Sequence, residues 1–522
     1  MAKTQSGDFS SKALAKNVVF SVVTFALNFF ISFYITPRIA GQFGSDTYGY
    51  LKLANDFASY AALFSIALNS MASRFIMLER ARGNTEKARQ YFSSVGVANT
   101  ILALIFVIPA VLCVRWLDTL FEIAPALVWE VKLTYALTFT NFILQLFFSI
   151  YSNCYYITNT LYLSSLRTSQ ASILNAVTVL SLFFFFQPRL SYVVCGTLAA
   201  TVFTICANVF YTRRLTPDLV FRFSDFSFRR VWTILSSGIW NSITQLSNIL
   251  TNQLNLLITN IFIGAATMGH LSVAVTAPNV IINFNATIAN VFSPNLMRLY
   301  AEGDREGMKQ AAKTAMRFMC LFVGLPVAVL LTMGTEFFSL WVPTEPAALL
   351  RALAVLTILN SIVTGPLQPI YQIFTITNKV RENSLVMICY GFVYLGVVYL
   401  LLKTTDLGVY AILGANLVGS LLVASFYHLP YAARHIGLPR WEFFPEIGRS
   451  ILSFAVVSAI GFGVSRVTDL SASWLHWFAG AAVTALLGFV CNLFLILRRE
   501  ERAMLREKVG GKLRRLLGRA EP

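Results

Sequence analysis

The sequence TYGYLKLA of residues 47–54 returns as TMGHLSVA in residues 267–274, with four of the eight positions identical at an offset of 220. In the same register Gly83 aligns with Gly303, in the polar loop that follows. Further along, the ITN of residues 157–159 recurs as residues 376–378. Because polar loop residues match as well as apolar ones, we interpret the pattern as an internal duplication with a one-residue gap.

The segments around these matches are strongly apolar. Of the 522 residues, 56% are hydrophobic and only 12% are charged, a balance that excludes an ordinary soluble enzyme. A transmembrane helix needs about 20 apolar residues. Hydropathy predicts an all-α polytopic membrane protein of about 14 transmembrane helices, near residues 14–36, 48–72, 95–116, 131–156, 166–186, 190–211, 231–259, 268–292, 316–333, 347–370, 386–402, 409–429, 447–466 and 474–497.

The duplication groups these helices into two pseudo-symmetric six-helix lobes. Six is an even number, so both lobes enter the membrane in the same orientation and are related by a pseudo-two-fold along the membrane normal. Transporters built from such halves bind substrate between them and alternate access by rocking. We expect an N-terminal lobe at 1–212, a C-terminal lobe at 213–440, two extra helices at 441–497 and a basic amphipathic cytoplasmic tail at 498–522.

The basic residues behind the net charge of +17 lie mostly on one predicted side of the membrane, a pattern that indicates membrane topology rather than a nucleic-acid-binding patch. Of the 41 Lys and Arg residues, 33 fall with the termini and the alternate loops on their side. Positive charge marks the cytoplasmic side, so both termini are predicted to be cytoplasmic. The N-terminal apolar segment is too long for the core of a signal peptide, and we expect it to remain in the mature protein.

The sequence offers no sign of an enzyme. Its hydrophilic segments are each too short to fold as a catalytic domain. Gly511-Lys512 is followed by Leu513, where a nucleotide-binding P-loop needs Ser or Thr. The seven cysteines are scattered through apolar segments without nearby histidines, which favours packing roles over a metal site. We predict a secondary transporter without a cofactor. Whether it uses a coupling ion, H⁺ or Na⁺, stays open.

Two predicted helices carry polar side chains along one face. Unpaired amides are costly in hydrocarbon, so such stripes indicate either a wet cavity that can bind sugar hydroxyls or hydrogen bonds between helices. The second polar helix also contains Pro366 and Pro369, which kink a helix and suggest a moving element. The alternative is that the prolines are simply tolerated, as they often are in membrane helices. With Asn69, the candidate glycan-binding residues are Asn241, Gln245, Asn248, Asn252 and Asn255 on one helix, and Asn360, Gln368 and Gln372 on the other.

Charges inside the predicted helices are few, and Asp56 and Arg74 both lie on the second one. Ionisable residues at such positions are functional candidates. Asp56 is a candidate for binding a coupling ion, and the alternative is an interfacial carboxylate. Arg74 is a candidate for binding an anionic substrate group, because a guanidinium suits bidentate contact with phosphate. The alternative for Arg74 is a side chain that snorkels to the membrane surface.

These features resemble the polysaccharide transporters, the Wzx-like flippases of the multidrug/oligosaccharidyl-lipid/polysaccharide (MOP) exporter superfamily. The resemblance covers nearly the whole chain. It rests on helices arranged as six plus six plus two, on Tyr48-Gly49 at the start of the second helix, on Ser73-Arg74-Phe75-Ile76 at its end, on the Gly83-Asn84 loop, and on the Asn378-Lys379-Val380-Arg381 turn.

The resemblance implies a flippase that moves a polyprenyl-diphosphate-linked oligosaccharide, such as an O-antigen repeat unit, from the cytoplasmic to the outer leaflet of a bacterial inner membrane. It implies a role in O-antigen or related surface polysaccharide biosynthesis, with membrane lipids and polysaccharide assembly proteins as further partners. Arg74 matches the arginine of the family's second helix and becomes the candidate for the diphosphate. Arg167, Arg298 and Arg317 are candidate cations at the cytoplasmic mouth.

Two other functions stay open at this point. One is an ion-coupled multidrug or toxic-compound extruder of the same superfamily, which usually has twelve helices and an acidic cavity. The two extra helices and the shortage of intramembrane acids favour the flippase. The other is a scaffold for polysaccharide enzymes, which has no need for polar stripes.

Overall fold

The computed structural model describes residues 30–121, 123–158, 160–289, 292–377, 379–499 and 501–502. This part of the chain is helical and contains no strand. Twelve of its helices are long and apolar enough to cross a membrane. Their positions coincide with twelve of the predicted segments, so the predicted class, an all-α polytopic membrane protein, is confirmed.

The other two predicted helices differ from these twelve for separate reasons. The first, at 14–36, lies mostly outside the described residues, as does most of the tail at 498–522. The seventh, at 231–259, is helical as α9 (Phe228–Asn248), the π-helical turn η3 (Ile249–Gln253) and α10 (Leu254–Phe262). Its polar stripe keeps its hydropathy below that of the other spans.

The chain divides into two compact units. Unit 1 comprises Met1–Val273 and Arg381–Gly396, and unit 2 comprises Ala274–Val380 and Val397–Pro522. Helix α17 (Val380–Thr404) contributes residues to both units. The lobe boundary expected after residue 212 stays a prediction.

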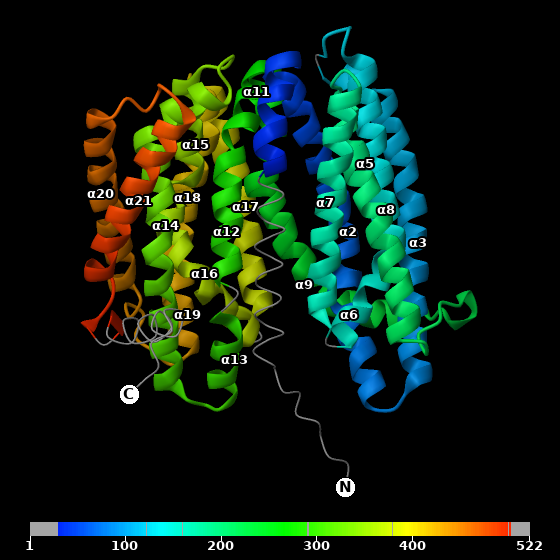
Figure 1. Ribbon diagram of the computed structural model, residues 1–522. Coiled ribbons are helices and arrows are strands. Elements are labelled where there is room, and N and C mark those ends of the chain that lie inside the picture. The colour runs from blue at the N-terminus through cyan, green and yellow to red at the C-terminus, as the bar shows by residue number, and fades with distance from the viewer. Residues whose placement is uncertain are drawn as a thin grey trace, which may run out of the picture. The chain divides into compact units, whose positions relative to one another are not determined.

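Unit 1 is built from long helices that run alongside one another, as Figure 1 shows for α3, α5 and α8. Its elements are α2 (Ser45–Ala81), α3 (Thr85–Arg115), α4 (Leu117–Leu120), α5 (Val128–Phe148), the 3-10 turn η1 (Ser149–Asn153), α6 (Cys154–Ile157), α7 (Leu161–Phe185), α8 (Leu190–Leu215), the 3-10 turn η2 (Phe223–Asp225), α9, η3, α10 and α11 (Ala265–Ala274).

Unit 2 is organised around α14, in whose most apolar stretch 67% of residues are buried, against 39% or less in the other spans. Helices α16, α20 and α21 all pack against α14. The elements of unit 2 are α12 (Thr276–Ala289), α13 (Ser293–Ala301), α14 (Arg305–Trp341), α15 (Ala347–Ile358), α16 (Ser361–Ile376), α18 (Val409–Val423), the π turn η5 (Ala424–His428), α19 (Leu429–His435), α20 (Phe444–Val467) and α21 (Trp474–Leu495).

The helix boundaries repeat with the spacing of the duplicated sequence. The positive-φ glycines Gly44 and Gly83 have counterparts at Gly264 and Gly303, in the same register as the sequence repeat. Five helices also have a partner that begins at the repeat spacing to within one position, which supports the duplication at the level of structure. The pairs are α2 and α11, α3 and α14, α5 and α15, α7 and α17, and α8 and α18.

The first repeat differs from the second in one helix that matters for function. Helix α2 runs for 37 residues, about 55 Å, which exceeds the roughly 30 Å of a bilayer's hydrocarbon core. Its counterpart is divided, since α11 ends at Ala274 and α12 begins at Thr276. The continuous helix is the one that carries Asp56 and Arg74.

The close packing of α9 on α2 depends on a glycine. A Cβ atom at Gly238 would lie 1.9 Å from the carbonyl oxygen of Ala67, so only glycine allows this approach. One turn later the Ser242 hydroxyl donates a 3.0 Å hydrogen bond to the Leu63 carbonyl. These contacts fix the polar helix α9 against the helix that carries the charged candidates.

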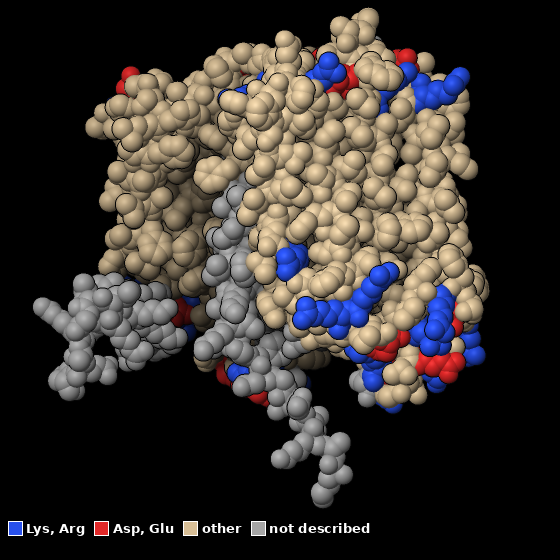
Figure 2. Space-filling view, turned by 45° about the vertical axis from the view of Figure 1, so that its right-hand side comes forward, with Lys and Arg blue, Asp and Glu red and all other residues tan. Residues whose placement is uncertain are grey.

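The surface of unit 1 agrees with a membrane location. On the face turned forward in Figure 2, charged side chains gather toward the two ends of the helices, and the side chains between them are almost all uncharged. Apolar side chains of α3, among them Ile101, Leu104 and Ile108, are also exposed. A surface of this composition is stable against lipid and not against water.

Candidate functional site

Helix α2 places the two predicted charged residues on one face. Eighteen residues separate Asp56 from Arg74, which is about five full turns or about 27 Å along the axis. Asp56 is half-buried and Arg74 is exposed. The Arg74 side chain has no hydrogen bond or ion pair with any described residue. Its charge is therefore not neutralised within the described part of the protein.

The sequence analysis missed a lysine beside Asp56. Lys52 lies one turn earlier on the same face of α2, and its ammonium group donates a 2.7 Å hydrogen bond to the Ser272 carbonyl oxygen. It also lies over the ring of Tyr48, 5.4 Å from the centroid. The spacing of four residues between Lys52 and Asp56 is the signal that could have identified this neighbour.

Asn69 takes part in a hydrogen-bond network that joins α2, α3 and η1. The Asn99 amide donates to the Asn69 side-chain oxygen at 3.0 Å and to the Ser149 hydroxyl at 2.8 Å. The Asn69 amide donates in turn to the Ser65 carbonyl at 3.0 Å. These bonds hold three elements of unit 1 together and leave the Asn69 side chain little capacity for a ligand.

The polar stripe of α9, η3 and α10 contains three kinds of side chain. Asn241 and Gln245 are half-buried and have no hydrogen-bond partner among the described residues. Asn248 and Asn252 are exposed, and the Asn252 amide donates to the Asn248 oxygen at 2.9 Å. Asn255 is buried, and its oxygen accepts a 2.7 Å hydrogen bond from the Tyr394 hydroxyl. Asn241 and Gln245 therefore offer amides to a ligand, whereas Asn248 and Asn252 pair with each other and Asn255 joins two helices of unit 1.

The candidates on the second polar helix lie in unit 2. Asn360 occupies the turn between α15 and α16, and its amide donates to the Ser420 hydroxyl at 3.1 Å. Gln368 and Gln372 are half-buried on α16, and Gln368 has no hydrogen-bond partner among the described residues. Both Pro366 and Pro369 lie inside α16, and the helix is interrupted before them, at Leu359 and Asn360.

The three candidate cations have partners of different kinds. Arg167 on α7 contacts the neutral side chains of Gln170 and Tyr211, each at 2.6 Å. Arg298 is exposed and pairs with Glu302 at 2.9 Å. Arg317 is buried and pairs with Glu446 at 3.2 Å and with Glu501 at 2.7 Å. Acidic partners balance the charges of Arg298 and Arg317, whereas neither Arg74 nor Arg167 has one among the described residues.

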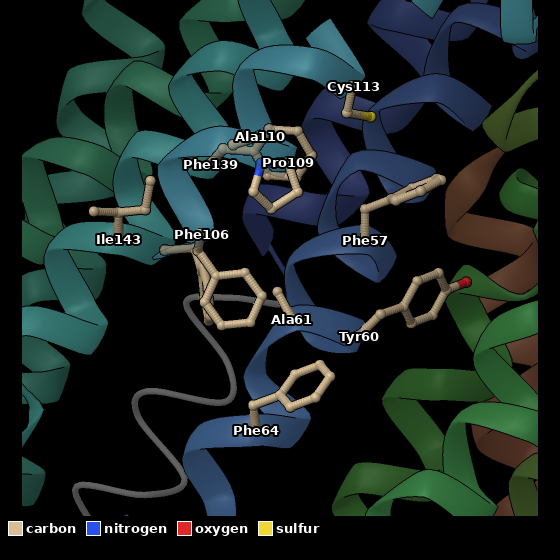
Figure 3. A pocket seen from close by; sticks show the side chains of 11 residues that line it. Phe57, Tyr60, Ala61, Phe64, Phe106, Pro109, Ala110, Cys113, Phe139 and Ile143 are labelled. Atoms are coloured by element: carbon tan, nitrogen blue, oxygen red, sulfur yellow. The ribbon is translucent and has the colours of Figure 1, made fainter. Parts of the chain in front are cut away.

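An apolar cavity of about 290 Å³ lies between α2, α3 and α5 in unit 1 (Figure 3). Phe64, Phe106 and Pro109 face its interior, whereas the hydroxyl of Tyr60 points away and donates to the Gln253 carbonyl at 3.0 Å. A lining of this kind accepts hydrocarbon and excludes sugars and phosphates. The polar candidates of unit 1 therefore belong to other surfaces of that unit.

Comparison with known proteins identifies the fold. No protein-family model matches the chain. It is 25% identical over 492 residues to the uncharacterized membrane protein EpsK of Bacillus subtilis (strain 168), a match that covers 93% of this chain and 96% of that protein. The inward closed structure of the lipid II flippase MurJ matches with a TM-score of 0.63 and 13% identity, covering 92% of this chain and 100% of that chain.

An inward-facing multidrug resistance MATE family transporter of the MOP superfamily matches with a TM-score of 0.59 and 16% identity, over 79% of this chain and 94% of that chain. The chain has the fold of MOP superfamily transporters. Identities of 13–16% establish the fold alone. The Wzx-like function and its substrate are therefore proposed below.

Proposed function

We propose that the protein is a flippase that moves a polyprenyl-diphosphate-linked oligosaccharide from the cytoplasmic to the outer leaflet of a bacterial inner membrane by alternating access. The observation that carries the proposal is Arg74, an exposed guanidinium on a membrane-spanning helix with no acidic partner among the described residues. An unpaired intramembrane cation is costly unless an anionic ligand compensates it. A diphosphate supplies that compensation through bidentate hydrogen bonds.

The polar face of α9 supports a glycan as the rest of the substrate. Asn241 and Gln245 offer both donors and acceptors, as sugar hydroxyls require. They lie on a helix that packs directly against α2, the helix of Arg74. Unit 1 therefore carries a diphosphate-binding group and glycan-binding groups on adjacent helices.

An ion-coupled multidrug extruder is the alternative, and the likeness to the MATE transporter favours it. Two observations count against it. Helices α20 and α21 are both long enough to span the membrane, so the chain has the two extra helices expected of the flippase. Asp56, the intramembrane acid that would attract a cationic drug, has Lys52 one turn away on the same helix face.

The proposed function is tested by depleting the protein in its native host and analysing lipid extracts by mass spectrometry. We expect a polyprenyl-diphosphate oligosaccharide to accumulate with its glycan facing the cytoplasm, because synthesis continues while translocation stops. The same measurement identifies the sugars. An unchanged lipid pool together with new sensitivity to cationic drugs would instead support the extruder.

Coupling to an ion gradient is tested at Asp56. We expect Asp56→Asn to make transport independent of the gradient, since the amide can no longer exchange a proton or bind a cation. Transport in vesicles with and without an imposed gradient measures this. Asp118→Asn is the matched control, because that carboxylate lies on the short helix α4, outside the membrane-spanning helices, and pairs with Lys132 at 2.8 Å. Unchanged gradient dependence in Asp56→Asn would remove this residue from the coupling mechanism.

A further inference from the structure

Helices α7 and α8 of unit 1 form a groove of about 440 Å³. Its lining combines two polar side chains with four apolar ones, and consists of Arg167, Gln170, Ile173, Leu174, Val177 and Phe203. The polar pair comes first along α7 and the apolar residues follow, so the groove has a polar end and an apolar length. This division matches a lipid, which joins a polar head to a hydrocarbon chain.

The polar end contains hydrogen-bond donors that the protein leaves unused. Arg167 donates to the hydroxyl oxygen of Tyr211 at 2.6 Å and lies over its ring at 5.2 Å, so the Tyr211 hydroxyl proton stays free to be donated. The Arg167 Nε atom is buried without a partner among the described residues. The same holds for the hydroxyl of Tyr155, which is 2% exposed and whose ring lies 5.8 Å from that of Tyr211.

Buried donors without acceptors are rare, because each one loses its hydrogen bonds to water and gains nothing in return. Here they cluster around a guanidinium that has no acidic partner among the described residues. A ligand with several anionic oxygens at the polar end would compensate the Arg167 guanidinium and accept the Tyr211 hydroxyl proton. A phosphate or diphosphate group meets that requirement, and Arg167 provides the fork that such a group binds.

The groove also has the right depth for a lipid. Arg167 and Phe186 are nineteen positions apart along α7 and its C-cap. The helix rises about 29 Å over this distance, which is close to the roughly 30 Å thickness of the hydrocarbon layer. Arg167 therefore lies at one boundary of the hydrocarbon layer, the one predicted to face the cytoplasm. Val177 lies ten residues further along, about 15 Å into the layer. A chain that hangs from a phosphate at Arg167 would follow Ile173 and Val177 inward.

Only the first repeat carries this polar end. At the corresponding positions of the second repeat, Arg167 is replaced by Val386, Gln170 by Cys389 and Tyr211 by Pro430. The fold of the repeat therefore does not require these polar groups. Their presence in one repeat and not in the other points to a ligand rather than to packing.

We propose that this groove is the docking site in the cytoplasmic leaflet for the lipid carrier, with the diphosphate at Arg167 and the adjoining Tyr211 and the polyprenyl chain along Ile173, Val177 and Phe203. The inference rests on the proposed function and adds a second place where the substrate is held, apart from Arg74. The apolar part of the groove is lined by Ile173, Leu174 and Val177 of α7 and by Phe203 of α8. Four apolar side chains suit a carrier with one chain better than a phospholipid with two.

The experiment uses the purified full-length protein in phosphatidylcholine nanodiscs and a polyprenyl diphosphate with a photoreactive group on its chain. Mass spectrometry of the irradiated protein is expected to find the label on α7 and α8. Arg167→Ala should reduce this labelling at least about tenfold, because it removes charge-assisted hydrogen bonds. Val177→Trp fills the apolar length, leaves the polar end intact, and should reduce labelling similarly.

Arg189→Ala is the matched control, since it removes an exposed arginine next to the opposite ends of the same two helices and should leave labelling unchanged. Arg167→Lys, which keeps the charge, should retain part of the labelling and guards against a folding defect in the alanine variant. Labelling of α7 that survives in both Arg167→Ala and Val177→Trp would overturn the inference. Equal competition by phosphatidylglycerol and by unlabelled polyprenyl diphosphate would also overturn it, because the groove would then be an ordinary phospholipid site.

A transport assay on the same wild-type preparation separates this inference from the proposed function. Translocation of a lipid-linked oligosaccharide without labelling of α7 or α8 would refute the groove and leave the flippase intact. Specific labelling without translocation would refute the flippase and leave a site for a lipid diphosphate. Translocation that slows in Arg167→Ala only at low substrate concentration is the result expected if the groove is a docking site.

Discussion

Arg74→Ala is expected to abolish translocation of the lipid-linked oligosaccharide while leaving the amount of folded protein in the membrane unchanged. The diphosphate must lose most of its water to enter the protein, and a guanidinium compensates that loss through two charge-assisted hydrogen bonds. Removing bonds worth about 1.5–3 kcal/mol each should slow transport at least about 100-fold. The fold should tolerate the change, because Arg74 is exposed and bonds to no described residue.

Reconstituted vesicles that contain the lipid-linked oligosaccharide measure this effect as the rate at which the glycan becomes accessible from the opposite side. Arg74→Lys should retain part of the rate, since it keeps the charge and loses the bidentate geometry. Arg82→Ala is the matched control at the C-cap of the same helix, because the exposed Arg82 side chain already has an acidic partner, Glu79, at 3.0 Å. A wild-type rate in Arg74→Ala would remove this residue from the substrate site.

Much of the fold could be predicted from the sequence, because the free energy of membrane insertion depends on local composition. Hydropathy located twelve spans but underestimated some of their lengths. The third was predicted at 95–116, whereas α3 begins at Thr85. Its first turns carry Glu86, Lys87 and Arg89, which a hydropathy window counts as loop. The structure continues the helix through them, because polar side chains can extend a helix beyond the bilayer.

The candidate site was predictable only where a signal lies within one helix. The spacing of Asn241, Gln245, Asn248 and Asn252 was sufficient to find the polar face of α9. Other roles depend on partners that are distant in the sequence. Asn255 bonds to Tyr394, which is 139 residues away, and no pattern within a helix indicates such a contact.

The same limit explains Arg317 and the groove. Arg317 resembles a free cation in the sequence, and its partner Glu446 is 129 residues away. Tyr211 lies 44 residues from Arg167, on the next membrane-spanning helix. The duplication located the repeats, and the structure was needed to show which side chains of one repeat meet across two helices.

Breaking the ion pair of Arg317 is expected to have the largest effect on stability. Arg317 and Glu446 are 4% and 2% exposed, and Arg449 and Glu501 complete a group of two positive and two negative charges. Glu446→Met removes one negative charge and leaves two arginines with Glu501 alone. A buried charge that loses its only partner costs about 3–5 kcal/mol, and Arg317, which keeps Glu501 at 2.7 Å, should lose a large part of that. Thermal unfolding in detergent should show a large decrease in Tm.

The double variant Arg317→Met/Glu446→Met separates this charge effect from a packing effect. It leaves one positive and one negative charge, both more exposed than the pair removed, so we expect it to recover much of the lost stability. Glu302→Ala is the control, because it breaks a pair whose side chains are 60% and 50% exposed, which is worth only about 0–1 kcal/mol. If the double variant is as unstable as Glu446→Met, then the loss of stability comes from packing, and the ion pair with Glu446 does not stabilise unit 2. If both unfold like the wild type, then Arg317 is free to act as the cation that the sequence suggested.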